Sequence, residues 1–327
     1  MSVSDAALAR LAEAIDAPDL AGTRYELRGR LGRGGMGTVW RALDRELGRE
    51  VALKVMNPVE PEPGAVARLR MEAKVLARLE HPGLVPVHDL GALPDGRLFY
   101  AMKLVRGRRL DEHVRGVSDL GARLRVFERI CDAVAFAHAQ GVIHRDLKPQ
   151  NVMVGPFGEV LVLDWGVAKV LGPEEAPSAE APETTPVASV PLDPDAATRT
   201  AAGTVLGTPG YMAPEQARGE TGVGIAADVY ALGAILEFLA GGAGPRALAA
   251  VAARARAARP EDRYATIGEL SDDISRFLSA RPVSAYREGP LEKGRRLAAK
   301  YRTPIALVLA YLVMRVVLAA MVKITRI

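Results

Sequence analysis

Three glycines and a lysine in the first sixth of the chain are spaced for binding phosphate groups. Gly32, Gly34 and Gly37 follow the order G-x-G-x-x-G, which leaves backbone N–H groups open to a bound anion. A dinucleotide-binding loop and a plain glycine turn share this order, so the flanking residues must show which kind of loop is present. Thr38–Ala42 is β-branched and aromatic, which predicts a strand after the loop and not a dinucleotide-binding helix. Lys54, on the next predicted strand, places an ammonium group under the turn.

A glutamate in the following helix is the predicted partner of that lysine. Glu72 lies within Ala65–Leu79, whose apolar residues recur at helical spacing. Glutamates on helices are ordinarily surface residues, but Leu76, four positions on, faces the predicted core, and Glu80 lies past the helix end beside His81-Pro82. We therefore interpret Glu72 as the residue that holds the Lys54 ammonium against the α- and β-phosphates of a nucleotide.

The most specific motif is His144-Arg-Asp-Leu-Lys-Pro-Gln-Asn151, which fixes seven residue types across eight positions. With these residues the chain resembles the serine/threonine protein kinases, and its Gly-Arg-Gly-Gly-Met-Gly loop is similar to that of the bacterial eukaryotic-like (Hanks-type) members. The resemblance covers about Tyr25–Ala280. It implies an ATP-dependent protein-serine/threonine kinase that uses ATP and Mg²⁺.

The resemblance assigns the catalytic and metal-binding roles. Asp146 would accept the proton of the substrate hydroxyl, and Lys148 would neutralise charge on the transferring phosphoryl group. Lys54 and Glu72 complete the predicted catalytic set. Asn151 and Asp164 would each bind a Mg²⁺ ion. Asp164 is followed by Trp165 where the family usually has Phe, so metal binding is expected to survive while the inactive-state geometry stays open.

The nucleotide site is implied in the same way. Met102 would be the gatekeeper, and the backbone of Lys103–Val105 would bond the adenine edge. Val39, Ala52 and Met153 would sandwich the ring. The complete predicted set is Leu31, Gly32, Gly34, Gly37, Val39, Ala52, Lys54, Met102, Lys103, Val105 and Met153.

Three more residues fall in the family's order beyond the metal site. Thr208 would contact the catalytic loop, Glu215 would pair with Arg263, and Asp228 would anchor the catalytic-loop backbone. An ordinary surface charge is the alternative for each of the charged residues, but their order along the chain matches that of the family. Between Gly241 and Arg263 the chain is shorter than the family norm, so a substrate-docking helix is expected to be reduced or missing.

The elements that must position these residues make an α+β fold with two lobes. Residues 25–105 predict a small antiparallel β-sheet with one helix, and 106–280 predict a larger, mainly helical lobe with short strands near Val152–Val154 and Val160–Val162. The strands predicted for the small lobe are Tyr25–Leu31, Thr38–Asp44, Glu50–Met56, Val85–Leu93 and Arg97–Lys103.

Composition marks two segments outside this core. Residues 1–24 form an extension with a short predicted helix, Asp5–Ile15. Residues 172–199 are acidic and rich in Pro and Ala with almost no large apolar side chains, which predicts a disordered insertion in the activation segment. The single cysteine, Cys131, excludes a disulfide framework and fits buried packing in a reducing compartment. No aromatic residues interleave with a basic face, so no nucleic-acid partner is expected.

The C-terminal residues predict a membrane anchor. Residues 281–303 carry seven basic and two acidic side chains, and 304–322 hold ten Leu, Ile or Val residues with one charge, Arg315. The length just suffices for a transmembrane helix, and the basic segment should stay inside, which leaves the kinase domain cytoplasmic and residues 323–327 as a short outer tail. The alternative is a helix docked on the soluble domain.

The residues argue against two other classes of function. A pseudokinase scaffold would bind ATP without turnover, but its mark would be loss of Lys54, Asp146 or Asp164, and all three are present. A purely structural membrane anchor does not explain the catalytic loop. The expected partners are ATP, proteins with Ser or Thr acceptors and the membrane. A homodimer, the substrates and the stimulus stay open.

Overall fold

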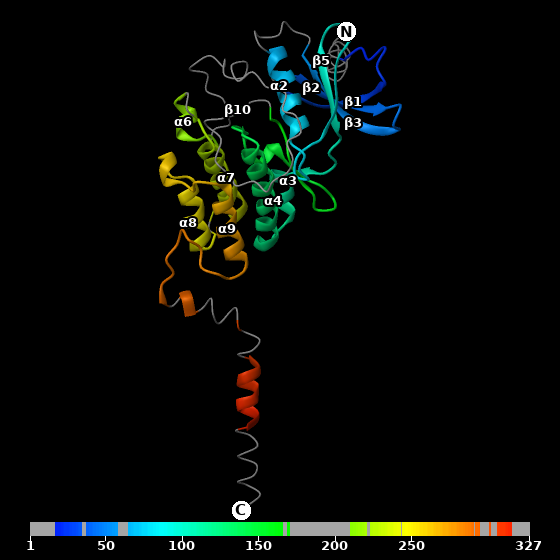
Figure 1. Cartoon of the computed structure of the whole chain (residues 1–327). Coiled ribbons are helices and arrows are strands. Elements are labelled where there is room, and N and C mark those ends of the chain that lie inside the picture. Colours follow the sequence, from blue (N-terminus) through cyan, green and yellow to red (C-terminus); the bar gives the residue numbers. More distant parts are fainter. Residues whose placement is uncertain are drawn as a thin grey trace, which may run out of the picture.

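The structure is a computed structural model of the 327-residue chain. It describes residues 17–34, 37–57, 65–165, 169–170, 210–220, 223–242, 244–290, 292–294, 301 and 306–315. The predicted helix Asp5–Ile15 and the predicted insertion 172–199 lie outside these residues. Figure 1 shows two lobes, a small one built on a β-sheet and a larger helical one beneath it.

The small lobe is a five-stranded antiparallel sheet in the order β1-β2-β3-β5-β4. Strand β1 alternates apolar and polar side chains at its start, whereas the inner strands β3 and β5 are buried over most of their length, so both faces of the sheet are covered there. The predicted strands are present, with ends shifted by up to two residues. Their bounds are β1 Tyr25–Arg33, β2 Gly37–Asp44, β3 Arg49–Met56, β4 Val87–Ala92 and β5 Leu98–Lys103.

Helix α2 (Ala65–Arg78) covers one face of this sheet and contacts β4 and β5. Its buried residues Leu69, Ala73 and Leu76 belong to the main core, which continues into the large lobe. A second core lies on the opposite face of the sheet around Trp40, where the segment before β1 adds Leu20. The sheet therefore has a face toward α2, here called the inner face, and an outer face.

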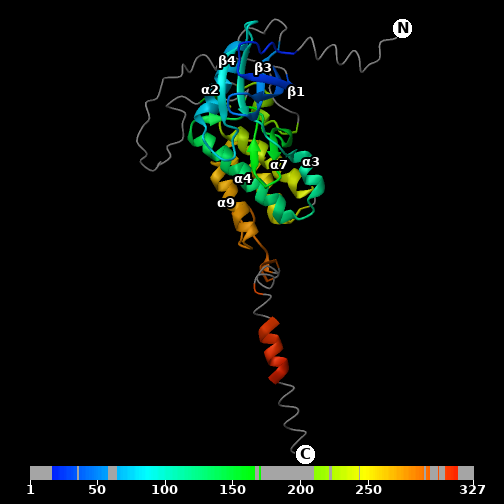
Figure 2. The same ribbon diagram turned by 90° about the vertical axis from the view of Figure 1, so that its right-hand side faces the viewer.

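The large lobe is organised around α4 (Leu120–Ala139), which packs against α7 (Ala226–Ala240) and α9 (Ile267–Leu278) (Figures 1 and 2). Asp119 caps α4 by accepting hydrogen bonds from the N–H groups of Gly121 and Ala122. Cys131 is fully buried in this helix, as predicted. Helix α8 (Arg246–Ala255) follows α7 directly, so only residues 241–245 link the two.

Short elements carry the chain between the lobes and along the cleft. They are β6 Arg108–Arg109, α3 Leu110–His113, η1 Val114–Gly116, β7 Val142–Ile143, η2 Pro149–Asn151, β8 Val152–Val154, β9 Val160–Val162, β10 Lys169–Val170, α6 Pro214–Ala217 and η3 Pro260–Asp262. Strands β6, β8 and β9 form one antiparallel sheet, and β7 pairs with β10. The catalytic-loop motif therefore lies between two small sheets.

The first residues after α9 fold back onto the large lobe. Val283 is buried in the main core, and the carboxylate of Asp273 accepts hydrogen bonds from the N–H and hydroxyl of Ser284 at 2.7 Å each. Part of the segment predicted to be juxtamembrane thus packs as part of the lobe.

The predicted transmembrane segment 304–322 lies only partly within the described residues. Residues 306–315 are helical and their large apolar side chains, such as Leu307 and Val308, are more than half exposed. Within the described part of the chain, no helix combines the length and the apolar character needed to cross a membrane.

Candidate active site

The ammonium of Lys54 and the carboxylate of Glu72 join the sheet to α2. Lys54 Nζ lies 2.6 Å from Glu72 Oε1 and 2.8 Å from Oε2, and both residues are buried. Lys54 faces inward because side chains alternate along β3, and Glu72 shares a helix face with Leu69 and Leu76. The pair predicted from the sequence is therefore formed.

Asp164 approaches the same lysine from the large lobe. Its Oδ1 lies 3.6 Å from Lys54 Nζ, its side chain is half exposed, and its backbone has a φ of 60°. Burial favours the neutral form of Lys54, but the charges of Glu72 and Asp164 outweigh it and raise the lysine pKa. The ammonium consequently stays charged at the junction of the two lobes.

The catalytic loop brings three of the predicted residues into one cluster. Lys148 Nζ donates to Asp146 Oδ2 at 2.6 Å, and the amide of Asn151 donates to the Asp146 carbonyl at 2.9 Å and to Oδ2 at 3.2 Å. With its N–H groups turned to Asp146, Asn151 keeps its amide oxygen for another ligand. That oxygen and the half-exposed carboxylate of Asp164 are the hard donors that Mg²⁺ prefers, so the residues fit this ion.

Asp228 on α7 anchors the backbone of the catalytic loop. Its carboxylate accepts the backbone N–H groups of His144 and Arg145, both at 2.8 Å, and lies 2.7 Å from His138 Nε2. Burial raises the pKa of Asp228, but the hydrogen bonds from His138 and the His144 N–H hold it below its usual value overall. Arg145 adopts a φ of 70°, so this anchor fixes a backbone turn that few non-glycine residues adopt.

Behind Asp164, the side chain of His144 packs against Trp165. Its ring lies 4.5 Å from that of Trp165, and its Nε2 is 2.9 Å from the Leu163 carbonyl. Trp165 is almost fully buried. The tryptophan thus occupies a core position beside Asp164, and His144 packs against it.

A second anchor holds the end of the activation segment. Arg263 donates to both carboxylate oxygens of Glu215, at 2.6 Å and 2.8 Å, and both side chains are buried. Gln216 next to it donates to the Arg145 carbonyl at 2.9 Å, which connects α6 to the catalytic loop. The predicted pair is present, while Thr208 lies outside the described residues.

The glycine loop joins β1 to β2 as predicted, with residues 35–36 outside the described part. Gly34 donates its N–H to the Gly37 carbonyl at 2.9 Å. A Cβ at Gly37 would lie 2.5 Å from the Val55 carbonyl oxygen, so only glycine lets the two strands approach this closely. The described end of the loop at Gly37 therefore lies beside Met56 at the C-terminal end of β3, two residues from Lys54.

The predicted adenine-site residues come from both lobes. Ala52 on β3 pairs with Met102 on β5, and Val39 on β2 is next to Lys54 in the register. Met153 lies on β8 of the large lobe and is half-buried, as are Val39 and Met102. Leu31 and Gly32 lie near the end of β1, Lys103 ends β5, and Val105 follows β5 in the loop.

Three contributors to this site were not found from the sequence. They are Tyr100, whose hydroxyl donates to Glu72, His138, which contacts Asp228, and Gln216, which bonds the catalytic loop. Tyr100 lies two residues before Met102, so strand alternation could have placed it on the Met102 face. Its hydroxyl contact depends on the position of α2, which no local pattern gives.

The family model of the protein kinase domain matches residues 25–257, which is most of the chain. The chain belongs to the protein kinase family. It is similar to serine/threonine-protein kinase PknD of Chlamydia felis (33% identity; 79% of this chain and 31% of the relative). It is also similar to serine/threonine-protein kinase PknA of Mycobacterium tuberculosis (38%; 65% and 45%). The chain thus spans less than half of either relative.

Among solved structures, the kinase domain resembles the crystal structure of the Mycobacterium tuberculosis PknI kinase domain. The identity is 26% and the TM-score is 0.54, with 77% of this chain and 95% of the other covered. The predicted resemblance to bacterial serine/threonine kinases and the two-lobed kinase fold are both confirmed.

Proposed function

We propose that the chain transfers the γ-phosphoryl group of ATP to Ser or Thr hydroxyls of proteins, its own included. One observation carries this proposal: Lys54–Glu72 from the small lobe and Asp146–Lys148–Asn151 from the large lobe are both assembled, and Asp164 of the large lobe lies 3.6 Å from Lys54. A scaffold that binds ATP without turnover has no need for the second group. The names of the relatives, serine/threonine-protein kinases, support the same acceptor class.

In the proposed reaction, the acceptor hydroxyl oxygen forms a bond to the γ-phosphorus while the bond from phosphorus to the ADP oxygen breaks. Asp146 orients the hydroxyl and accepts its proton. Lys148, which already contacts Asp146, neutralises charge on the transferring group. Lys54, held by Glu72, binds the α- and β-phosphates. Bound Mg²⁺, held by Asn151 and Asp164, would supply charge neutralisation of the phosphates.

The test of this function is phosphate incorporation from radiolabelled ATP by the purified full-length chain. We expect Asp146→Asn to reduce autophosphorylation on the order of 10²-fold or more, because the amide cannot accept the proton. The variant should still bind Mg·ATP, which separates lost chemistry from lost folding. Incorporation by Asp146→Asn equal to that of the unaltered chain would exclude this mechanism.

We also propose that residues 304–322 anchor the protein in the cell membrane as a single span, with the kinase domain in the cytoplasm. The support is the apolar composition and the exposure of the apolar side chains on the helix over residues 306–315. Hydrocarbon would satisfy such a surface better than water does.

Carbonate extraction of cell membranes tests the anchor. The full-length chain should stay in the membrane pellet, and a chain ending at Thr303 should be soluble. Release of the full-length chain by carbonate would instead favour a helix docked on the soluble domain.

A further inference from the structure

Tyr100 on β5 lies directly opposite Lys54 on β3 in the antiparallel register. Directly opposed residues of neighbouring strands project from the same face of a sheet, so both side chains point toward α2. The Tyr100 hydroxyl donates to Glu72 Oε1 at 2.9 Å, and the residue is only 1% exposed. Three elements therefore meet at one carboxylate.

Glu72 accepts hydrogen bonds from two donors, the flexible side chain of Lys54 and the rigid side chain of Tyr100. Lys54 Nζ bonds both carboxylate oxygens and lies 5.9 Å from the centre of the Tyr100 ring. Its ammonium sits on a flexible stem and, by the proposed function, must also reach the ATP phosphates. The tyrosine ring is rigid and buried, so its hydroxyl stays where β5 places it.

The hydroxyl of Tyr100 keeps its proton at neutral pH. Burial and the neighbouring Glu72 charge raise the pKa of Tyr100 well above its usual value. The group is consequently a permanent donor to Glu72, and a hydrogen bond from a neutral donor to a carboxylate is among the stronger ones in proteins.

We propose that Tyr100 is a positioning residue for ATP binding. Through the hydrogen bond from its hydroxyl, it holds the Glu72 carboxylate and α2 in place while Lys54 engages the phosphates. The inference rests on the proposed kinase function. It goes beyond the Lys54–Glu72 pair because it gives α2 a second connection to the sheet, one that does not pass through the lysine.

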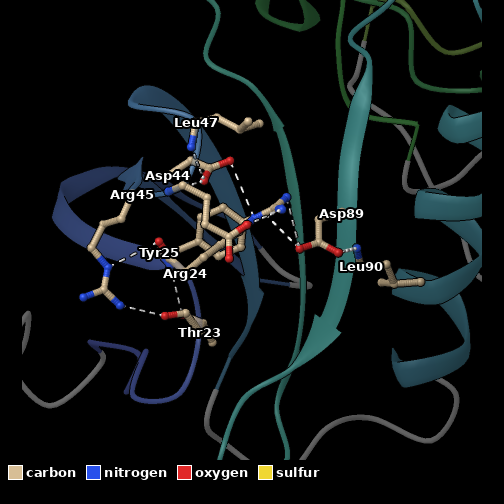
Figure 3. Close-up of polar contacts among 9 residues, drawn as sticks. Thr23, Arg24, Tyr25, Asp44, Arg45, Leu47, Asp89 and Leu90 are labelled. Carbon is tan, nitrogen blue, oxygen red and sulfur yellow. Dashed lines mark hydrogen bonds and ion pairs between the residues drawn. The ribbon is translucent and has the colours of Figure 1, made fainter.

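A matched control exists on the other face of the same sheet. The Tyr25 hydroxyl donates to Asp89 Oδ2 at 2.9 Å, and Tyr25 is 3% exposed (Figure 3). Tyr25→Phe and Tyr100→Phe therefore each remove one hydroxyl, and one hydrogen bond to a carboxylate, from a buried ring in the small lobe. Tyr25→Phe also removes the two hydrogen bonds that the Tyr25 hydroxyl accepts from Arg24, so the control is the larger local change. Only Tyr100→Phe touches the lysine–glutamate pair.

The experiment compares Tyr100→Phe, Tyr25→Phe and the unaltered full-length chain in detergent, with Mg·ATP varied at saturating protein substrate. We expect kcat/KM for ATP to fall roughly tenfold in Tyr100→Phe, mostly through KM, which is the effect of one hydrogen bond to a charged group. Tyr25→Phe should stay near the unaltered value. Amide hydrogen exchange without nucleotide should become faster in α2 for Tyr100→Phe alone.

Each outcome decides whether the Tyr100 hydroxyl positions Glu72 or Tyr100 only fills space in the core. A KM for Tyr100→Phe equal to that of Tyr25→Phe, or an equal rise in both, would overturn the proposal. Unchanged exchange in α2 would do the same. If the unaltered chain incorporates no phosphate, the proposed function fails, but the exchange measurement still tests whether Tyr100 holds α2.

Discussion

The two faces of the small-lobe sheet both carry tyrosine, cation and carboxylate groups, yet they are built differently. On the inner face, Lys54, Glu72 and Tyr100 form a buried, closed cluster. On the outer face, Arg24 lies within 3.6 Å of carboxylate oxygens of Asp44, Glu46 and Asp89, and its side chain is partly exposed. Figure 3 shows Arg24 and Tyr25 together with the carboxylates of Asp44 and Asp89.

The two faces differ in how much is lost when one contact is removed. Arg24 has several partners and solvent nearby, so loss of one contact leaves others, and exposed ion pairs contribute little. Glu72 is buried with two donors, so loss of either leaves a charge that water cannot reach. A buried cluster with few members fixes geometry for a ligand, whereas a half-exposed network tolerates change.

The largest expected effect comes from exchanging the cation on each face for methionine. Lys54→Met should reduce phosphoryl transfer on the order of 10²-fold or more, because the phosphates lose their charged contact from the small lobe. Arg24→Met, the matched outer-face variant, should keep activity close to that of the unaltered chain. Radiolabelled ATP incorporation measures both. Equal losses in the two variants would mean that the faces do not differ in function.

A smaller effect extends the comparison to the large lobe, where Asp228 is the buried carboxylate and outer-face Asp89 the exposed control. We expect Asp228→Asn to lower the free energy of unfolding by about 3 kcal/mol, because it disrupts the hydrogen bonds to the His144 and Arg145 N–H groups. Asp89→Asn should cost less than about 1 kcal/mol. Urea denaturation at pH 7 tests both values.

The contribution of Asp228 to stability should also depend on pH, and the shift of its pKa predicts the direction. The pKa of Asp228 is lower in the folded protein than its ordinary value of about 4 in the unfolded chain. Its contribution to stability is therefore complete above about pH 4 and is lost as the pH falls below it. The stability difference between the unaltered chain and Asp228→Asn should shrink on acidification, and a constant difference would contradict the assignment.

Sequence patterns predicted the parts of this molecule that are local or fixed by motif. Alternation and helical spacing gave β1 to β5 and α2, and motif order gave the Lys54–Glu72 and Glu215–Arg263 pairs. The contact of Tyr100 with Glu72 depends on how α2 sits on the sheet, which no spacing in one strand contains. Likewise, Val283 packs into the large lobe because the segment after α9 is held by hydrogen bonds to Asp273. Composition alone indicates only a basic linker for this segment.

The smallest expected effect belongs to the outer face and appears only at alkaline pH. Burial raises the pKa of Tyr25 to about 12, with the Arg24 guanidinium lowering it in part and the hydrogen bond to Asp89 raising it further. The unfolded value is about 10. Because the folded-state pKa is the higher one, the contribution of the protonated hydroxyl is complete below about pH 10 and is lost as the pH rises toward 12.

Urea denaturation of the unaltered chain and of Tyr25→Phe at pH 8 and at pH values of about 10 to 11 tests this expectation. The stability advantage of the unaltered chain should decline as the pH rises. The other tyrosines titrate in both proteins, so the difference isolates Tyr25. If that difference does not change with pH, the Tyr25–Asp89 bond does not contribute as the outer network implies, and the two faces would differ even more than their contacts suggest.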